Sequence, residues 1–165
     1  MAKIGIYATF LSEEQKQKIK KIASAYGYSI AYFKDTNEAA AGIADCEILY
    51  GYYPASLLPH AEKLRWLATA SAGVDSYLED CVYAHPNQVI VTNSAGSYGV
   101  TISEHMIMVI LMLMRRMPEY TEVVRQRRWE NIGAVRSILG SRFTIVGMGD
   151  IGTQLARRLK ALGAA

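Results

Sequence analysis

Five short apolar runs occur in the first part of the chain, up to Asn93. Polar, helix-like segments separate them, and within each run apolar residues follow one another instead of alternating with polar ones. Strands that are covered on both faces show this continuous pattern. Since strands joined through helices form a doubly wound parallel α/β sheet, we predict such a sheet here. Its strands are expected at Lys3–Ala8, Tyr28–Phe33, Cys46–Gly51, Arg65–Ser71 and Gln88–Asn93.

The clearest helix signal follows the first strand, in the stretch SEEQKQKIKKIASAYG. Ser12 is the expected N-cap, Gln15 completes a capping box, and Glu13 and Glu14 suit the positive end of the helix dipole. Gly27 is expected to end this helix. Two weaker segments follow: a short helix in TNEAAAGIAD, and a broken helical turn in PASLLPHAEKL, which holds two prolines.

The second part of the chain predicts long helices instead of short strands. The stretch Glu104–Met117 is apolar almost all round, so we expect one helix that is buried on most sides. Pro118 interrupts it, and PEYTEVVRQRRWE predicts a more polar helix after that. Further on, Phe143–Val146 predicts a sixth strand, and Ile151–Leu162 predicts a last helix.

A change of composition marks a domain boundary. The small residues of NSAGSYG, just before the long helix, favour a boundary near residues 94–104. We therefore expect a sheet domain at 1–97, followed at 98–165 by helices and a strand–helix unit. With 165 residues, half of them hydrophobic and a fifth charged, the chain can bury a core.

The formal net charge of +3 is unevenly distributed. Residues 1–100 carry 8 basic and 10 acidic side chains, whereas residues 101–165 carry 10 and 5. The arginines of RRMPEYTEVVRQRRWE are interleaved with Glu119, Glu122 and Glu130, which dilutes any stripe that could follow a phosphate backbone. Because helix-turn-helix and zinc-finger spacings are also missing, we expect no nucleic-acid binding.

Cysteine usage and hydropathy indicate the compartment. Cys46 and Cys81 stand apart, with no C-x-x-C or other metal-ligand spacing, and the start MAKIGIYA is too short an apolar run for a signal peptide. We expect a cytoplasmic protein with reduced cysteines and no metal. The longest apolar run, Met106–Met114, is about half the length that a bilayer requires, so we expect no membrane span.

The sequence VGMGDIG places Gly147, Gly149 and Gly152 between the predicted sixth strand and the last helix. In a G-x-G-x-x-G pattern the first glycine makes the tight turn, the second lets a pyrophosphate approach, and the third lets helix and strand pack closely. Amides at the helix start then point at the phosphates. An ordinary glycine-rich turn is the alternative. The acidic residue that would bind the ribose is expected about 20 residues beyond the glycines, which is past the last residue of this sequence. The choice between NAD and NADP therefore stays open.

A second candidate loop lies in ATASAGVDSYL, where a predicted strand ends at Ser71. The chain turns through Ala72, Gly73 and Val74, and successive N–H groups at the carboxyl end of a parallel strand can bind a carboxylate. Gly73 has no side chain, so a ligand could come close. From this stretch alone we favour the alternative, a plain strand–helix turn in which Asp75 caps the next short helix.

Glu104 and His105 stand together at the predicted start of the long helix. Such a pair can indicate acid–base chemistry, but we favour a structural interpretation, in which Ser103 or Thr101 caps the helix and Glu104 complements its dipole. His105 is expected to pack near an interface. The methionine-rich stripe of this helix is expected to be core or dimer surface.

Two histidines and two tyrosines in loops show no sequence pattern that is typical of a binding site. His60 and His85 lie beside prolines in loops, and nothing near them indicates ligation. Tyr52 and Tyr53 follow the third strand, where they either line the mouth of a pocket or are simply half-exposed. We favour exposure for both.

Three stretches, taken with their spacing, resemble one enzyme family. SAGVD, then VTNSAGSYGVTISEH with LMLMRR, and then LGSRFTIVGMGDIG are similar to the NAD-dependent D-isomer-specific 2-hydroxyacid dehydrogenases. The resemblance implies a flavodoxin-like doubly wound substrate domain, followed by the first βα unit of a Rossmann nucleotide-binding domain. It also implies NAD as the cofactor, with NADP not excluded, and a small 2-hydroxy or 2-keto acid as the substrate.

The resemblance also implies roles for individual residues. The amides of Ala72, Gly73 and Val74 would hold the substrate carboxylate, and Thr101 would lie near the nicotinamide. The contacts to the cofactor diphosphate would come from Gly147, Gly149, Asp150, Ile151 and Gly152. A homodimer would form through the 104–117 helix, and a helix from a distant C-terminal part would pack on the early segment.

The chain departs from the family pattern in three respects. Met148 stands where leucine is usual, and Ser103 where alanine often precedes the Glu-His pair. The family's catalytic arginine, glutamate and histidine match no position here, so His60, His85 and His105 are not candidates. We therefore expect a truncated chain with little or no turnover by itself.

The predicted sixth strand raises a related problem, because a single strand has no neighbour for its backbone hydrogen bonds. We expect this βα unit to be disordered, to pack irregularly on the substrate domain, or to pair with another copy.

The alternative function is a non-enzymatic flavodoxin-like module that binds a ligand or a partner. Two other doubly wound families fit less well. A phospho-receiver needs acidic residues after its first strand and an aspartate after its third, where this chain has YATF and YGYY. A flavodoxin needs a Ser/Thr/Gly phosphate loop after its first strand, and ATFLS is a poor match.

Overall fold

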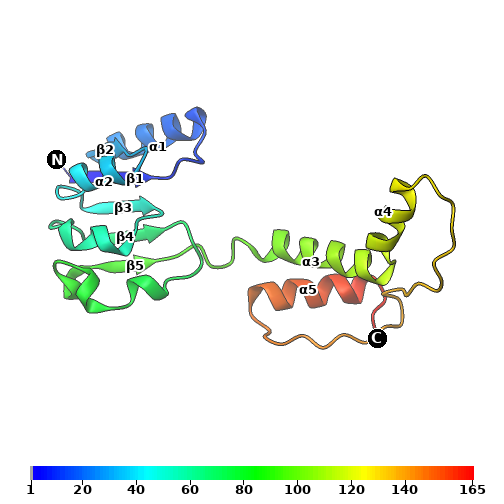
Figure 1. Ribbon diagram of the computed structural model, residues 1–165. Coiled ribbons are helices and arrows are strands. Elements are labelled where there is room, and N and C mark those ends of the chain that lie inside the picture. Colours follow the sequence, from blue (N-terminus) through cyan, green and yellow to red (C-terminus); the bar gives the residue numbers. More distant parts are fainter. Residues whose placement is uncertain (1) are drawn as a thin grey trace. The chain divides into compact units, whose positions relative to one another are not determined.

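The computed structural model describes residues 2–165, which divide into two compact units. One unit ends at Ala95 and the other begins at Gly96. The first unit is an α/β sheet, and the second is built of helices (Figure 1).

The first unit is a five-stranded sheet in the order β2-β1-β3-β4-β5. All neighbouring strands are parallel. The chain moves from β1 outward to β2 and then returns to the other side of β1, so the predicted doubly wound α/β fold is confirmed. The strands are β1 (Ala2–Tyr7), β2 (Tyr28–Tyr32), β3 (Ile48–Gly51), β4 (Trp66–Thr69) and β5 (Ile90–Thr92).

Helix α1 (Glu13–Ala25) begins with the predicted capping box. The Gln15 N–H donates to Ser12 Oγ at 3.2 Å, and the Ser12 N–H donates to Gln15 Oε1 at 2.8 Å. Two orphan donors of the first turn are satisfied in this way. The next helix, α2 (Thr36–Gly42), is capped by Asp35.

The later connections of the sheet are 3-10 turns in place of α-helices. Pro59 lies inside the first of these turns and Pro86 begins the last, and proline cannot donate the backbone hydrogen bond that a longer helix needs. The turns are η1 (Ala55–His60), η2 (Asp75–Tyr77), η3 (Asp80–Val82) and η4 (Pro86–Gln88).

The core of the first unit lies between one face of the sheet and α2 with η1. Gly5 of β1 is required there, since a Cβ would stand 2.8 Å from Leu49 Cδ2 and 2.9 Å from Phe33 Cε2. Cys46 is fully buried in this core, and burial raises the pKa of its thiol, which therefore stays protonated. The buried members are Phe33, Ala39, Ile43, Cys46, Leu49, Tyr53, Leu58, Ala61, Leu64, Leu67 and Tyr77.

Tyr52 and Tyr53 differ sharply in burial. Tyr52 is 47% exposed, as predicted, but Tyr53 is 2% exposed, so the prediction was wrong for Tyr53. Its ring makes edge contacts with Tyr7 and Phe33 at centroid distances of 5.7 Å and 6.5 Å. Its carbonyl accepts from the Tyr77 hydroxyl at 2.6 Å, whereas its own hydroxyl has no partner among the described residues. Tyr53 is therefore a core residue.

The other face of the sheet is covered only in part. Helix α1 packs on β2, but Trp66 of β4 is 42% exposed and Ile90 of β5 is 65% exposed. Ile48, Trp66 and Ile90 stand opposite one another in the register of three neighbouring strands. The prediction that the strands are covered on both faces is thus wrong for β4 and β5 within residues 2–165.

The second unit begins with α3 (Gly99–Met114), which starts earlier than the predicted 104–117 helix. The predicted caps are wrong, because Tyr98 is the N-cap residue and no side chain caps the helix. Ser103 is buried inside the helix, where its hydroxyl donates to the Val100 carbonyl at 2.8 Å. A local bond of this kind lets a buried serine remain in a helix without an unpaired hydroxyl.

Arg116 separates α3 from α4 (Met117–Arg125). Its φ is +56°, in the left-handed region, so the first helix ends there. Pro118 then lies in the first turn of α4, where proline is tolerated because its missing N–H has no helical partner. The predicted interruption therefore occurs at Arg116, and Pro118 starts the new helix.

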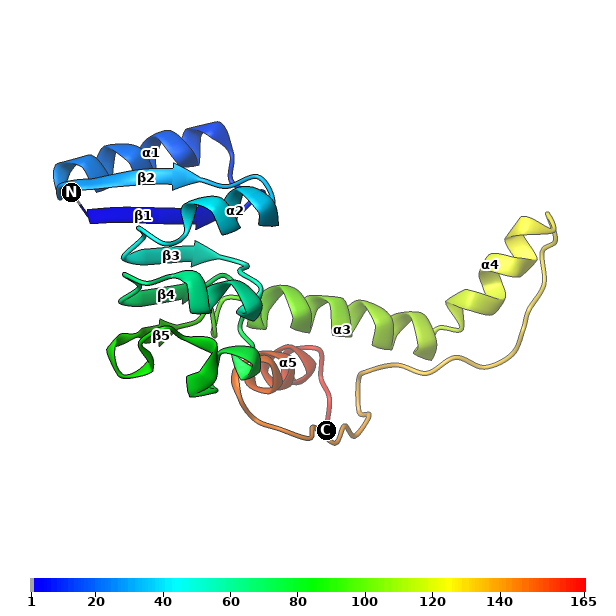
Figure 2. The same ribbon diagram turned by 60° about the vertical axis from the view of Figure 1, so that its left-hand side comes forward.

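Helix α5 (Asp150–Ala161) lies side by side with α3 in both ribbon views (Figures 1 and 2). The side chains buried between them include Leu155 and Leu159 of α5 and Met114 of α3. The partly buried residues packed against this cluster are Ile107, Ile110, Phe143, Ile145 and Ala164. Helix packing thus forms the small core of the second unit.

Phe143–Val146, predicted as a sixth strand, is irregular, so this prediction was wrong. The described residues offer it no neighbouring strand, and its backbone cannot form a ladder. Phe143 and Ile145 pack on the helical core instead, while Val146 is 97% exposed. Of the arrangements that we expected, irregular packing occurs, but against the helices of its own unit.

Within residues 2–165, the long helix is not buried on most sides, which differs from the prediction. Six apolar side chains of α3, which we call the α3 apolar face, are 36–64% exposed. They are Met106, Met108, Val109, Leu111, Met112 and Leu113. Within residues 2–165, no helix has the length and apolar character that a membrane span requires.

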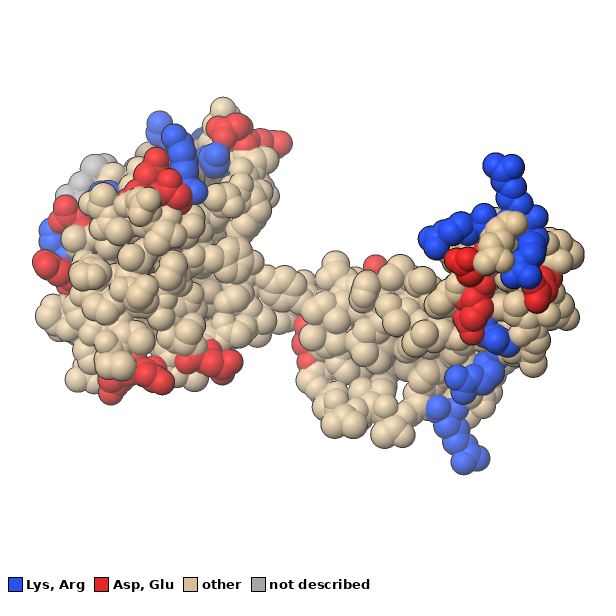
Figure 3. Space-filling view, viewed as in Figure 1, with Lys and Arg blue, Asp and Glu red and all other residues tan. Residues whose placement is uncertain are grey.

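Charged side chains of both signs gather around α4 (Figure 3). Arg125 pairs with Glu122 at 3.3 Å, and Arg128 pairs with Glu130 at 2.9 Å. Exposed pairs of this kind contribute little to stability. They do, however, place an acidic side chain beside each of these two arginines.

Candidate functional site

The glycine loop, which we define as Gly147–Gly152, joins the irregular segment to α5. Gly147 has a φ of +91°, in the left-handed region that residues with side chains avoid. A Cβ on Gly152 would overlap the Gly147 carbonyl oxygen and would stand 3.4 Å from Ile145 Cγ2. The first glycine therefore makes the turn, and the third permits loop and helix to touch.

Gly149 has different surroundings. Its φ is −74°, which any residue can adopt, and nothing lies within 4 Å of its Cβ position. Neither backbone conformation nor packing requires a glycine here, so its effect is to leave space beside the backbone. Thr153 closes the loop, since its hydroxyl donates to the Met148 carbonyl at 3.1 Å and its N–H to the Gly149 carbonyl at 3.0 Å.

The N-terminus of α5 opens directly into this space. The helix has 12 residues, Gly149 is its N-cap residue, and no side chain caps its first turn. Uncapped N–H groups at the positive end of a helix dipole bind anions. Backbone donors next to unfilled space fit a diphosphate group, so the loop has the shape that the predicted NAD site requires.

The side chain of Asp150 is directed at α3. Its carboxylate lies against Gly99, the first residue of α3, where a Cβ would overlap all three carboxylate atoms. Thr101 lies in the same turn of α3, is exposed, and donates its hydroxyl to the Tyr98 carbonyl at 3.2 Å. The structure thus places Thr101 in the same unit as the glycine loop, within one turn of α3 of the Gly99–Asp150 contact.

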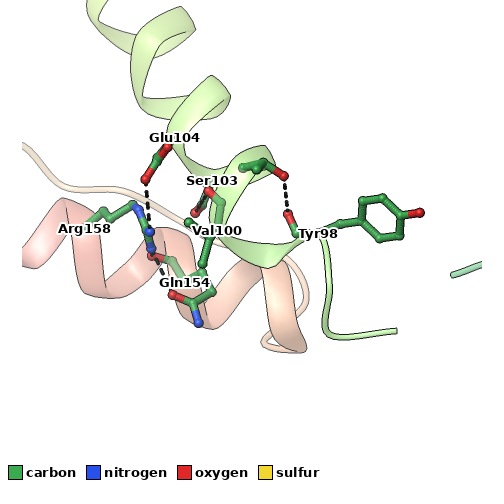
Figure 4. A network of polar contacts seen from close by, with 7 residues as sticks. Tyr98, Val100, Ser103, Glu104, Gln154 and Arg158 are labelled. Atoms are coloured by element: carbon green, nitrogen blue, oxygen red, sulfur yellow. Dashed lines mark hydrogen bonds and ion pairs between the residues drawn. The ribbon is translucent and has the colours of Figure 1, made fainter. Parts of the chain in front are cut away.

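Figure 4 shows the polar contacts that join α5 to α3 further along. Arg158 Nη2 lies 3.5 Å from Glu104 Oε1, and Arg158 Nη1 donates to Gln154 Oε1 at 2.9 Å. Because α3 begins at Gly99, Glu104 lies inside the helix and outside its first turn. The predicted interaction of Glu104 with the helix dipole was therefore wrong. His105 is exposed in this chain, and its packing near an interface remains a prediction.

The β4 loop, which we define as Ala72–Val74, follows β4 in the first unit. Asn93 Nδ2 donates to the Ala72 carbonyl at 2.8 Å, and the Ser71 hydroxyl donates to the Gly73 carbonyl at 2.7 Å. The backbone N–H groups of Ala72, Gly73 and Val74 donate no hydrogen bond within residues 2–165. The carbonyls are fixed, and the amides remain available to an anion.

The β4 loop also offers space. Nothing lies within 4 Å of the Cβ position of Gly73, while Val74 packs against the core and anchors the loop. The alternative in which Asp75 caps the next helix is wrong, because Val74 occupies the N-cap position of η2 and no side chain makes a capping bond. A simple capped turn does not describe this loop.

An aromatic pair stands at the carboxyl ends of neighbouring strands. Tyr52 follows β3, and its ring makes an edge contact with Phe10 at a centroid distance of 5.9 Å. Its hydroxyl donates to the carbonyl of Ala70, the residue after β4, at 3.3 Å. Since parallel strands end at the same edge of a sheet, this pair forms an apolar wall near the β4 loop.

Sequence reasoning missed the side chains that shape both loops. Asn93 and Ser71 hold the β4 loop, and the Ser94 hydroxyl supports the end of β4 by donating to the Thr69 carbonyl at 3.2 Å. A search for polar residues where neighbouring parallel strands end would have found Asn93. No sequence signal identifies Gly99, because its partner Asp150 is distant in the chain.

The two candidate loops lie in separate units, the β4 loop in the first and the glycine loop in the second. The predicted roles of Ala72–Val74, Thr101 and the glycine loop residues remain predictions. The geometry supports anion binding by backbone amides at both places. His60 and His85 are exposed, like His105.

A comparison with sequence models of protein families matches residues 107–165, which include the glycine loop and α5. The matching family is described as "D-isomer specific 2-hydroxyacid dehydrogenase, NAD binding domain". This match confirms the resemblance that the sequence motifs carried and the prediction of an NAD-binding domain.

Several named dehydrogenases are similar in sequence to about two thirds of the chain. The formate dehydrogenase of Neurospora crassa is 32% identical over 113 residues, which are 67% of this chain and 30% of the relative. The D-3-phosphoglycerate dehydrogenase of Bacillus subtilis is 35% identical over 102 residues, which are 61% of this chain and 19% of the relative. The matches therefore span less than a third of these relatives' own length.

Solved structures are similar over nearly the whole chain. A D-isomer specific 2-hydroxyacid dehydrogenase family protein from Aeromonas salmonicida matches with a TM-score of 0.83 and 26% identity, over 99% of this chain and 51% of that one. An NAD⁺-bound 3-phosphoglycerate dehydrogenase from Entamoeba histolytica matches with a TM-score of 0.73 at 16% identity, over 99% and 52%. The second likeness concerns the fold alone. The chain spans about half the length of these solved chains.

We predict that Gly152→Ala destabilises the second unit, whereas Gly149→Ser does not. The methyl group at position 152 overlaps the Gly147 carbonyl, so we expect a loss of about 1–3 kcal/mol in the free energy of unfolding. Serine at position 149 has space and is a favoured N-cap residue, so we expect a change within about 0.5 kcal/mol. Urea denaturation of both variants measures this difference, and equal losses would contradict it.

Proposed function

We propose, from its membership of the D-isomer specific 2-hydroxyacid dehydrogenase family, that the protein transfers hydride between NAD and a small 2-hydroxy or 2-keto acid. The observation that carries this proposal is the glycine loop. It combines the left-handed Gly147, the close contact at Gly152 and an uncapped helix N-terminus within the part that matches the NAD-binding domain.

On the cofactor side, we assign diphosphate binding to the backbone of the glycine loop. The amides of Asp150 and Ile151 stand at the N-terminus of α5, and Gly149 leaves the space that a phosphate group needs. Bound NAD supplies a nicotinamide carbon that accepts or donates hydride. Thr101, which is exposed in the first turn of α3, is the side chain that we assign to the nicotinamide end, as the resemblance implies.

On the substrate side, we assign the carboxylate to the amides of the β4 loop. Three N–H groups at one strand end can hold both carboxylate oxygens and so fix the orientation of the neighbouring C2 atom. The aromatic pair of Phe10 and Tyr52 then faces the substrate's side chain. The resemblance places the groups that exchange a proton with the C2 oxygen outside the matched residues, so we assign no such role to His60, His85 or His105.

We also propose that the protein is a homodimer in which a second copy covers the α3 apolar face. Six apolar side chains of this helix are 36–64% exposed, and clusters of exposed apolar side chains mark interaction surfaces. The resemblance implies a dimer through this same part of the chain.

NAD binding provides the direct test of the glycine loop. Gly149→Val should raise the dissociation constant for NAD at least tenfold, or ~1.4 kcal/mol, because the valine side chain fills the space left for a phosphate group. Val124→Ala, a change at a 71% exposed position on α4, should leave the constant unchanged. Isothermal titration calorimetry measures both, and equal affinity of the two variants would contradict the assignment.

Direct substrate binding tests the β4 loop. Gly73→Val should raise the dissociation constant for glyoxylate, pyruvate or hydroxypyruvate, measured by calorimetric titration, at least tenfold, ~1.4 kcal/mol, while the affinity for NAD stays the same. The added side chain would stand where the substrate carboxylate approaches. Ser76→Ala, at an exposed position of η2, serves as the control. An unchanged dissociation constant in Gly73→Val would contradict the assignment of the carboxylate to this loop.

The oligomeric state tests the α3 apolar face. Sedimentation equilibrium at about micromolar concentration should give twice the monomer mass, because burial of apolar surface drives association. Leu113→Lys places a charge on this face and should shift the protein to monomers. Leu78→Lys, at a position of the first unit that is also about 65% exposed, should not. A monomeric wild-type protein would refute the dimer.

A further inference from the structure

The contact between Asp150 and Gly99 joins the glycine loop to the start of α3. A Cβ on Gly99 would overlap both carboxylate oxygens and the carboxyl carbon of Asp150. Gly99 is buried and does not have the positive φ that would itself call for glycine. The space that the Asp150 carboxylate occupies therefore explains why a glycine stands at this position.

The position of this carboxylate matters because Asp150 directly follows Gly149. Asp150 is the first residue of α5, at the helix end to which we assign the cofactor diphosphate. A carboxylate that faced a diphosphate would repel it. The first turn of α5 carries no basic side chain that could offset this charge, since the basic residues of this helix, Arg157, Arg158 and Lys160, lie in its second half.

Helix α3 provides a more favourable place for the carboxylate. No side chain caps the N-terminus of this 16-residue helix, and a carboxylate is stabilised at the positive end of a helix dipole. The pairs Gly99–Asp150 and Glu104–Arg158 show that α3 and α5 run in the same direction. The two N-termini therefore lie at the same end of the pair, and the Asp150 carboxylate lies beside α3.

We infer that Gly99 is a positioning residue for cofactor binding, because it gives the Asp150 carboxylate a place on α3 and so keeps its negative charge away from the diphosphate. The inference rests on the proposed function of the glycine loop. It concerns a residue outside that loop, which acts on the cofactor only through Asp150.

The test compares charge with size in four variants of the protein. Gly99→Ala should displace the Asp150 carboxylate and raise the dissociation constant for NAD at least tenfold. In Gly99→Ala/Asp150→Asn the displaced side chain has the same size but no charge, so the affinity should return to within about threefold of the wild type. Asp150→Asn alone keeps the backbone amide and changes only the side chain, so it is the matched reference, and the double variant should bind within about threefold of it. Gly99→Ala/Asp150→Ala removes the overlap itself and should restore both affinity and stability.

Two measurements separate the electrostatic role from a structural one. Calorimetric titration with NAD gives the affinity, and the loss in Gly99→Ala should shrink as salt is raised, because screening weakens the repulsion. Urea denaturation without cofactor gives the stability, which Gly99→Ala/Asp150→Asn should not recover. Where Gly99→Ala does not fold, Asp150→Glu displaces the charge with Gly99 intact and should bind NAD more weakly than Asp150→Gln, which has the same length and no charge.

The outcomes distinguish this inference from the function on which it rests. If the wild-type protein binds NAD and Gly99→Ala binds it equally well, the inference is overturned and the proposed function stands. If affinity stays low in Gly99→Ala/Asp150→Asn, size and not charge is responsible, and the inference is again overturned. If the wild type gives no heat with NAD, both are overturned.

Discussion

The packing of α5 along α3 holds the glycine loop in its shape. In a complete sheet, ladder hydrogen bonds would fix the strand before such a loop, but Phe143–Val146 has no neighbouring strand in residues 2–165. Leu155 and Leu159 are 4% and 3% exposed, and burial of one such side chain contributes about 1.5–3 kcal/mol. A few buried side chains between two helices thus set the direction in which the first amides of α5 point.

Features whose partners lie close together in the chain could be predicted from the sequence. The capping box of α1 joins Ser12 to Gln15, and Gly152 contacts Gly147 across a single turn. The parallel sheet followed from five apolar runs, since each run is itself a local pattern. The family resemblance rested on motifs of the same short range, and the family comparison confirmed it.

Features that depend on distant partners could not be predicted in this way. Local capping signals predicted the start of α3 at Glu104, but the helix begins at Gly99, where Asp150 packs from another part of the chain. Apolarity predicted that α3 is buried and that Phe143–Val146 is a strand, yet burial needs a covering element and a strand needs a neighbour. The position of Asn93 at a strand end makes it a candidate, but its bond to the Ala72 carbonyl depends on how two neighbouring strands are paired.

The hydrogen bonds that hold the β4 loop affect how it meets a ligand. Asn93 and Ser71 already bind the carbonyls of Ala72 and Gly73, so the conformation of the loop is set before any anion arrives. Ordering a loosely held segment on association costs conformational entropy, and a preorganised one avoids that cost. An incoming carboxylate therefore has to shed its hydration water and align itself, but it does not have to refold its receptor.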